Sequence, residues 1–171
     1  DLFEVWVGDD AASAGSFEAR CGQVLAACRA ELAFMRGNRD FLVGHELLGP
    51  LGVHDLPDPC RLDWQGESLL LSHGDLLCID DTAYQAFRQQ VRSPAWQQDF
   101  LARPLAERQA LARHMRAQSQ AAQAAVETLA DVDDPTARQW LLHAGVRCLI
   151  HGHTHRPADH DLGPDPAGQS L

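Results

Sequence analysis

Residues 32–40 read LAFMRGNRD, an apolar run that passes directly into a polar loop. The run is typical of a short buried strand, and the glycine, asparagine and aspartate after it favour a turn. Two later segments repeat this arrangement: residues 68–75 read SLLLSHGD, and residues 146–155 read VRCLIHGHTH. Polar residues at the ends of strands in an α/β protein collect at the carboxyl edge of the sheet. We therefore expect an α/β layer architecture with a site at that edge.

The remaining sequence predicts helices around these strands. Ser16 is placed to cap a core-facing amphipathic helix that runs to about residue 30. Alanine, glutamine and arginine dominate residues 82–130, and Pro94 and Pro104 divide this block into three predicted helices. Further expected elements are a short helix over 41–49, a hairpin turn at 65–66, a helix from about 135 to 143 and a C-terminal loop. Residues 2–7 fit either a strand or a tight turn.

The amino-acid composition argues against several classes of protein. Hydrophobic residues make up 45% and charged residues 22% of the 171 residues, which is ordinary for a folded protein. All 14 basic residues are arginine, and 24 acidic residues give a net charge of −10, which disfavours nucleic-acid binding. Five cysteines without a CxxC pair fit neither a disulfide framework nor a thiolate zinc site. Cysteines used in this way favour a reducing cytosol, and no long apolar run or basic leader is evident.

Three histidines, His151, His153 and His155, alternate near the end of the chain. Alternate side chains of an extended segment point the same way, so these imidazoles are expected to converge on one point. Converging imidazoles favour a divalent metal. The pattern taken alone fits a polar loop with solvated histidines equally well.

Other metal donors follow the other predicted strands. Asp1, Asn38 and His73 supply carboxylate, amide and imidazole groups, a set that favours Mn, Fe or Zn over a structural zinc knot. Two metals about 3.5–4 Å apart, bridged by a carboxylate, generate hydroxide and stabilise phosphoryl transfer. Arg39 would then stabilise the charge on a phosphate. Ordinary explanations stay open: Asn38 in a turn, Asp40 as a helix cap, His73 as a structural residue, and Arg39 and Asp1 as solvated charges.

Several motifs, taken in order, carry a resemblance to a known family. Residues 37–40 (GNRD), 73–75 (HGD) and 152–157 (GHTHRP) resemble the calcineurin-like metallophosphoesterases. Four more specific strings are similar to the UDP-2,3-diacylglucosamine diphosphatase family of the lipid A pathway: DLFEVWVGDD (1–10), LCIDD (77–81), YQAFR (84–88) and MRAQS (115–119). The resemblance extends from Asp1 to about His160. It implies a β-sandwich flanked by helices, forming a single partial domain over 1–171 with an inserted helical lid at about 82–134.

The resemblance also implies a site. Asp1 would bridge two Mn²⁺ ions, with Asn38, His73 and His153 on one ion and His155 on the other. Arg39, Asn38 and His153 would be the catalytic residues at the reacting phosphate. The implied substrate-binding residues are Asn38, Arg39, Asp81, Tyr84, Ser119 and His153.

The reaction implied by the resemblance is hydrolysis of the pyrophosphate bond of UDP-2,3-diacylglucosamine. A metal-activated water would attack the α-phosphorus and release UMP and 2,3-diacylglucosamine 1-phosphate (lipid X). The enzyme would act as a peripheral protein on the cytoplasmic face of the inner membrane. Apolar lid residues are candidates to line a groove for the acyl chains, although helix packing explains any single one of them equally well: Phe87, Val91, Trp96, Phe100 and Leu101.

The sequence departs from the family pattern at both ends and in the lid. The family's first strand, with its Asp-x-His metal motif, and its C-terminal sheet portion are not found here, so Asp1 and His155 alone would hold one metal. We therefore expect a fragment that is inactive or poorly folded by itself. The lysines that the family has after Ser119 are replaced by glutamine and alanine, and Arg113 and Arg116 are either substitutes or solvated charges. A soluble nucleotide or phosphodiester substrate, or an inactive metal-binding fragment, stays open.

Overall fold

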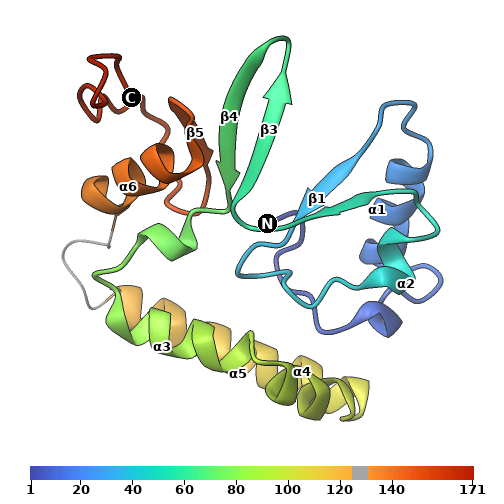
Figure 1. The fold of residues 1–171 in the computed structure, drawn as a ribbon. Coiled ribbons are helices and arrows are strands. Elements are labelled where there is room, and N and C mark those ends of the chain that lie inside the picture. The colour runs from blue at the N-terminus through green and yellow to red at the C-terminus, as the bar shows by residue number, and fades with distance from the viewer. Residues whose placement is uncertain (125–130) are drawn as a thin grey trace. The chain divides into compact units, whose positions relative to one another are not determined.

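A computed structural model describes residues 1–124 and 131–171 (Figure 1). The described chain has a mixed α/β fold with helices and two small sheets. Its residues form two compact units, one containing residues 1–56 and 86–124, the other residues 57–85 and 131–171. Each unit is described by itself below.

The first unit contains a two-stranded parallel sheet. Strand β1 (Ala33–Met35) pairs with β2 (His54–Leu56), and helix α2 (His45–Leu48) lies between them in the chain. The apolar run predicted β1 correctly. Strand β2 was not predicted, because His54 and Asp55 are polar and only the pairing with β1 makes this segment a strand.

Helices α1 (Phe17–Ala26), α4 (Pro94–Leu101) and α5 (Leu105–Ala124) begin where the sequence predicts, whereas the short helix expected over 41–49 covers only His45–Leu48 (α2). The Ser16 hydroxyl accepts a hydrogen bond from the amide of Ala19 (3.0 Å) and caps α1. Helices α4 and α5 begin at or just after the predicted proline breaks. However, α1 ends earlier than expected and only part of its apolar stripe faces the core: Cys21 packs against the core, whereas Phe17 and Val24 are 59% and 72% exposed. Two three-residue strands offer too little apolar surface to cover the stripe.

The core of the first unit is built largely from residues outside regular elements. Phe3 and Trp6 are 2% and 3% exposed, and their ring centroids lie 4.4 Å apart. The segment 2–7, which the sequence left open, is therefore neither strand nor helix but a buried irregular segment. The other buried members of this core are Val7, Phe34, Leu42, Val43, Leu48 and Phe100.

Two acidic residues after Gly8 hold this unit together. The Asp9 carboxylate accepts hydrogen bonds from the amides of Gly44 (2.9 Å) and Leu47 (3.1 Å) at the start of α2. Asp10 forms an ion pair with Arg108 of α5, whose guanidinium is almost fully buried. The same guanidinium also donates to the carbonyl oxygens of Val7 and Arg103. The N-terminal segment is thus attached to both α2 and α5.

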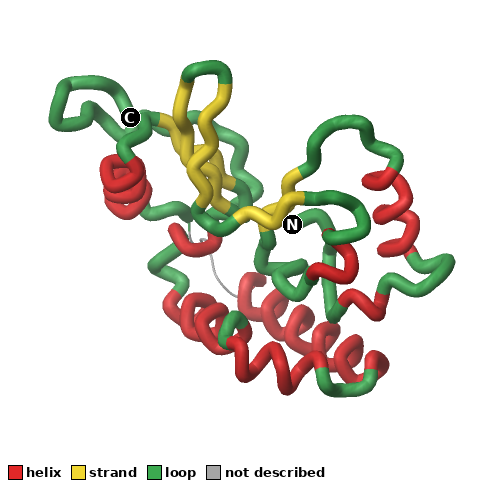
Figure 2. The backbone as a smooth tube through the Cα atoms, turned by 45° about the vertical axis from the view of Figure 1, so that its right-hand side comes forward, coloured by secondary structure: helices red, strands yellow, loops and turns green. Residues whose placement is uncertain are grey.

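The second unit contains a three-stranded mixed sheet, seen as one group of strands in Figure 2. Strand β4 (Glu67–Ser72) pairs antiparallel with β3 (Cys60–Trp64) and parallel with β5 (Cys148–His151). The predicted hairpin turn is confirmed, and Gln65 and Gly66 both have positive φ. Helix α6 (Asp134–Ala144) is capped by the Asp133 side chain. Helix α3 (Thr82–Val91) follows a short 3₁₀ turn, with residues 82–85 in this unit and 86–91 in the first.

The predicted mixed α/β class is confirmed, while the β-sandwich and the single-domain boundaries stay predictions. Helices α3, α4 and α5 occupy most of the segment expected to be a lid, and residues 125–130 of that segment lie outside the described residues. All five cysteines are free thiols. Across residues 1–124 and 131–171, no helix is both long and apolar enough to cross a membrane.

The buried Arg108 guanidinium gives a prediction for stability. Arg108→Ala leaves the Val7 and Arg103 carbonyls without this donor and removes the partner of Asp10. We expect the free energy of unfolding to fall by about 2–3 kcal/mol, measured by urea denaturation. The matched control is Arg103→Ala, which breaks an exposed ion pair with Asp99 and should leave the free energy of unfolding almost unchanged. Equal losses in the two variants would contradict this assignment.

The Asp10 carboxyl should make stability depend on pH. Its hydrogen bond to Arg108 holds the pKa of Asp10 below its usual value. A carboxyl whose pKa is lowered by folding stabilises the protein above its unfolded pKa of about 3.9, and this contribution disappears as the pH falls through the folded pKa. The difference in unfolding free energy between wild type and Asp10→Asn should therefore be larger at pH 6 than at pH 3. If the difference in unfolding free energy were the same at both pH values, folding would not lower the pKa of Asp10.

Candidate active site

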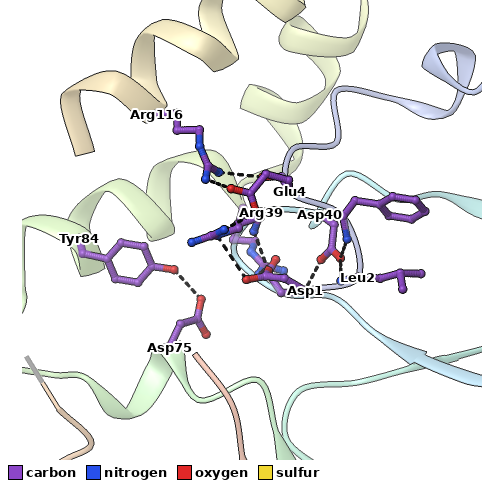
Figure 3. A network of polar contacts seen from close by, with 11 residues as sticks. Asp1, Leu2, Glu4, Arg39, Asp40, Asp75, Tyr84 and Arg116 are labelled. Atoms are coloured by element: carbon purple, nitrogen blue, oxygen red, sulfur yellow. Dashed lines mark hydrogen bonds and ion pairs between the residues drawn. The ribbon is translucent and has the colours of Figure 1, made fainter. Parts of the chain in front are cut away.

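The loop after β1 is organised by the buried carboxylate of Asp40. Its Oδ1 accepts a hydrogen bond from the amide of Gly37 (2.7 Å), and its Oδ2 accepts from the amides of Leu2 (2.5 Å) and Phe3 (3.2 Å), as Figure 3 shows in part. Asp40 is 0% exposed. The sequence suggested a helix cap, which is wrong, because α2 is capped at Gly44 and the carboxylate instead joins the loop to the N-terminal segment.

This junction brings together three predicted site residues. The Asp1 carboxylate accepts a hydrogen bond from the amide of Arg39 (2.9 Å) and lies 3.7 Å from the Arg39 side-chain Nε. Asn38 lies between Gly37 and Arg39 in the same loop. A Cβ atom at Gly37 would overlap the Asp1 carboxylate, so only glycine permits this close approach. Asp1, Asn38 and Arg39 therefore form one polar cluster in the first unit.

Arg39 has a second acidic neighbour that the sequence did not single out. Its guanidinium lies 2.5 Å from Oε2 of Glu4, and Arg116 of α5 contacts Oε1 of the same carboxylate (Figure 3). Arg116 also donates to the Glu4 carbonyl oxygen (2.9 Å). Glu4 lies inside one of the motifs that carry the resemblance, but an exposed glutamate has no signal in a sequence to distinguish it from a solvated charge. Arg116 is thus an ion-pair partner rather than a free surface charge.

In the second unit, the carboxyl ends of two of the three predicted strands lie at one sheet edge, whereas β1 belongs to a separate sheet. Ser72 and His151 are the last paired residues of the parallel strands β4 and β5, so His73 and Gly152 follow at the same edge. The Gly152 amide donates to the His73 carbonyl (3.0 Å). Gly74 has a φ of 104°, and a Cβ there would lie 2.8 Å from the Gly152 oxygen. The HGD motif requires glycine at this position for both reasons.

Three predicted site residues gather beside this edge. The ring centroid of His153 lies 5.2 Å from that of His73 and 5.6 Å from that of Tyr84. The Tyr84 hydroxyl donates to the fully buried Asp75 carboxylate (2.6 Å), as Figure 3 shows. A tyrosine held in this way has a fixed ring, so it gives the His153 imidazole a defined neighbour.

The expectation that three alternating histidines point the same way is wrong. Strand β5 ends at His151, and both His153 (φ 70°) and His155 (φ 55°) are in the left-handed region. The chain turns after the strand, so alternation no longer places side chains on one face. His153 faces His73, whereas His155 is exposed.

Of two more predicted substrate-binding residues, one caps a helix and the other is exposed. The Asp81 carboxylate accepts a hydrogen bond from the Tyr84 amide (2.9 Å) and so caps the first turn of α3. Ser119 is exposed on α5.

Among the residues proposed to line the acyl-chain groove, Val91 and Phe100 are each 3% exposed, and the rings of Trp96 and Phe100 stack with centroids 4.8 Å apart. These three pack within the protein, whereas Phe87 and Leu101 are exposed.

The sequence also missed a second positioning carboxylate. Asp58 Oδ1 accepts hydrogen bonds from the Ser72 hydroxyl (2.7 Å) and the His73 amide (3.3 Å). It therefore fixes the end of β4 from which His73 projects. Its partner residues are far away in the chain, so no local pattern could have revealed this role.

Cys78 is not a candidate nucleophile. Burial, with nearby Asp131, Asp75 and Asp81, raises the pKa of its thiol to about 11. Only the thiolate is nucleophilic, and it is scarcely populated at neutral pH.

The donor types fit a divalent metal that prefers oxygen and nitrogen ligands. The first unit supplies the Asp1 carboxylate and the Asn38 amide, and the second unit supplies the imidazoles of His73 and His153. Within the part of the chain that the structure describes, no three His, Cys, Asp or Glu side chains are grouped to hold a metal. By donor type these residues suit Mn, Fe or Zn, the metals that the sequence favours.

Comparisons with known proteins place this chain among hydrolases. A protein named UDP-2,3-diacylglucosamine hydrolase from Xanthomonas oryzae pv. oryzae is 48% identical over 95% of this chain and 69% of its own length. Proteins of the same name from Stenotrophomonas maltophilia (47% identity, 95% of this chain, 69% of that protein) and Chromobacterium violaceum (48%, 94% and 68%) are similar. No protein-family model matches. The chain belongs to the UDP-2,3-diacylglucosamine hydrolase family.

The hydrogen bonds to Asp40 give a prediction for this site. Both carboxylate oxygens accept backbone amides, so Asp40→Asn would place an amide NH₂ against at least one N–H donor. We expect the free energy of unfolding to fall by about 2–3 kcal/mol in urea denaturation. Asp99→Asn, which changes an exposed ion pair, is the control and should cost less than about 1 kcal/mol. A loss in Asp40→Asn no larger than in the control would show that the carboxylate does not organise the loop.

Proposed function

We propose that this chain hydrolyses the pyrophosphate bond of UDP-2,3-diacylglucosamine. The observation that carries the proposal is 48% identity over 95% of the chain to a protein named for that reaction. The similarity extends through the strand-end loops and the helices alike, so it includes both the polar clusters and the segment proposed as a lid.

The reaction exchanges one phosphorus–oxygen bond for another. Water attacks the α-phosphorus, the bond from that phosphorus to the bridging oxygen breaks, and the bridging oxygen leaves with the β-phosphate. The products are UMP and 2,3-diacylglucosamine 1-phosphate, which belong to the lipid A pathway. Negative charge accumulates on the phosphate oxygens in the transition state, so the protein must supply positive charge there.

Two Mn²⁺ ions are the proposed cofactors. The proposed ligands are Asp1, Asn38, His73, His153 and His155. When bound, manganese supplies Lewis-acid activation of water and neutralises phosphate charge. Asn38 and His153 would also contact the substrate, as would Asp81, Tyr84 and Ser119 at the sugar headgroup.

Arg39 is proposed as the residue that binds the reacting phosphate. Its amide is fixed to Asp1, so its guanidinium starts from a defined backbone position. A guanidinium donates through a planar fork and remains charged at every physiological pH. It thus holds the phosphate and stabilises the additional charge that develops there.

The proposed location is the cytoplasmic face of the inner membrane, with the protein bound peripherally. The acyl chains of the substrate require an apolar surface. Phe87 and Leu101 are exposed apolar side chains, at 39% and 42%, on helices of the proposed lid. Docking through such residues suits a chain without lysine and with a net charge of −10.

The direct test is UMP release from UDP-2,3-diacylglucosamine in detergent micelles with Mn²⁺. In a chain extended at both ends, we expect activity that EDTA removes and added Mn²⁺ restores. Arg39→Ala and His153→Ala should each lower kcat/KM by about 100-fold or more, because each removes a group at the reacting phosphate. Matched controls are Arg20→Ala and His114→Ala, exposed residues whose substitution should leave the rate within about two-fold.

Two outcomes would contradict the proposal. Faster hydrolysis of a soluble UDP-sugar than of the UDP-lipid would show that the substrate is a soluble nucleotide. Stoichiometric Mn²⁺ binding without turnover, in this chain and in one extended at both ends, would show that the fold has lost catalysis.

A further inference from the structure

We propose that Arg39 and Arg116 together form one anion site, and that the Glu4 carboxylate occupies it until a substrate phosphate replaces it. This inference deepens the proposed function and rests on it for the identity of the phosphate. It adds a second phosphate-binding arginine, from α5, and an internal competitor.

The first argument is the geometry around Glu4. The two guanidiniums bind different oxygens of one carboxylate, Arg39 at Oε2 and Arg116 at Oε1. They come from the loop after β1 and from α5, so only the fold brings them together (Figure 3). Two cations that converge on one point repel each other unless an anion lies between them. Glu4 supplies the anion that the two guanidiniums share, while Asp1 lies near Arg39 alone.

The second argument is that both arginines have anchors that do not depend on the Glu4 carboxylate. Arg116 donates to the Glu4 backbone carbonyl (2.9 Å). The Arg39 amide is bonded to Asp1, whose carboxylate also lies 3.7 Å from the Arg39 Nε. If the Glu4 side chain rotates away, both guanidiniums are still held near their present positions. A preorganised pair of arginines binds an incoming anion without a large ordering cost.

The third argument is the contrast in exposure. The Glu4 side chain is 66% exposed, whereas those of Arg39 and Arg116 are 32% and 28% exposed. An exposed carboxylate in such a pair contributes little binding energy, and solvent readily accommodates it when it leaves. A phosphate carries more charge and more acceptor oxygens than a carboxylate, so it is the better partner for two guanidinium forks. Exchange of Glu4 for phosphate is therefore favourable.

Glu4 then affects specificity as well as structure. Any weakly bound anion must compete with a carboxylate that is covalently part of the chain and always present. Only a ligand with additional contacts elsewhere, such as the sugar and lipid of the proposed substrate, gains enough to displace it. Removing the Glu4 charge should thus improve binding of simple anions.

The test is calorimetric titration of the full chain with inorganic phosphate in low-salt buffer. Glu4→Gln removes the competitor and should bind phosphate up to about five-fold more tightly than wild type. Arg116→Gln should bind it at least five-fold more weakly, and Arg116→Lys should recover part of the loss because it restores the charge. The matched controls are Glu107→Gln and Arg113→Gln, which make the same changes of charge at exposed positions of α5 and should leave the affinity unchanged.

Steady-state kinetics supply the second readout. Arg116→Gln should raise KM for the UDP-lipid by about ten-fold with kcat within about two-fold, the signature of lost binding rather than lost chemistry. Phosphate affinity that is unchanged or weaker in Glu4→Gln would overturn the exchange, and phosphate affinity that is unchanged in Arg116→Gln would overturn the paired site. Because the titration does not require turnover, a chain that binds phosphate as expected but releases no UMP would refute the proposed substrate alone.

Discussion

The buried carboxylate of Asp40 joins the N-terminal segment to the loop after β1, and the first unit depends on this junction. Three backbone amides, from Leu2, Phe3 and Gly37, converge on two oxygens that no solvent reaches. Hydrogen bonds to a buried charged acceptor are stronger than those between neutral groups, and leaving them unmade is costly. This single side chain therefore fixes the loop after β1 against a segment that has no regular structure of its own.

Several features of the site follow from that junction. With the N-terminal segment in place, Phe3 and Trp6 enter the core, and Asp1 and Glu4 lie beside Arg39. Arg108 and Arg116, eight residues apart on α5, then attach the helix to this segment through Asp10 and Glu4. Buried contacts set the position of the backbone, and exposed ion pairs on it remain free to exchange. The proposed binding of phosphate uses this division between rigid support and replaceable charge.

In both units, the backbone of the loop after a strand is positioned in the same way. In each, a polar loop follows a strand, a glycine allows a close approach, and a carboxylate outside the strand fixes the backbone: Gly37 with Asp40, and Gly74 with Asp58. In the second unit, the hydrogen bond from the Tyr84 hydroxyl to Asp75 positions the Tyr84 ring, which lies beside the His153 imidazole. Acidic residues thus hold the backbone and the Tyr84 ring beside the proposed site residues.

The sequence by itself determined the α/β class, most strands and helices, and the strand-end loops, because apolar runs, proline breaks and capping residues act locally. It also determined the family, since strings such as YQAFR and MRAQS are runs of consecutive residues that can be recognised without the fold. Only the tertiary structure decided the roles of Asp40, Asp58 and Glu4, the pairing of β2, and the direction of His153 and His155. Those depend on partners distant in sequence or on a local left-handed turn, and neither leaves a periodic signal in the sequence.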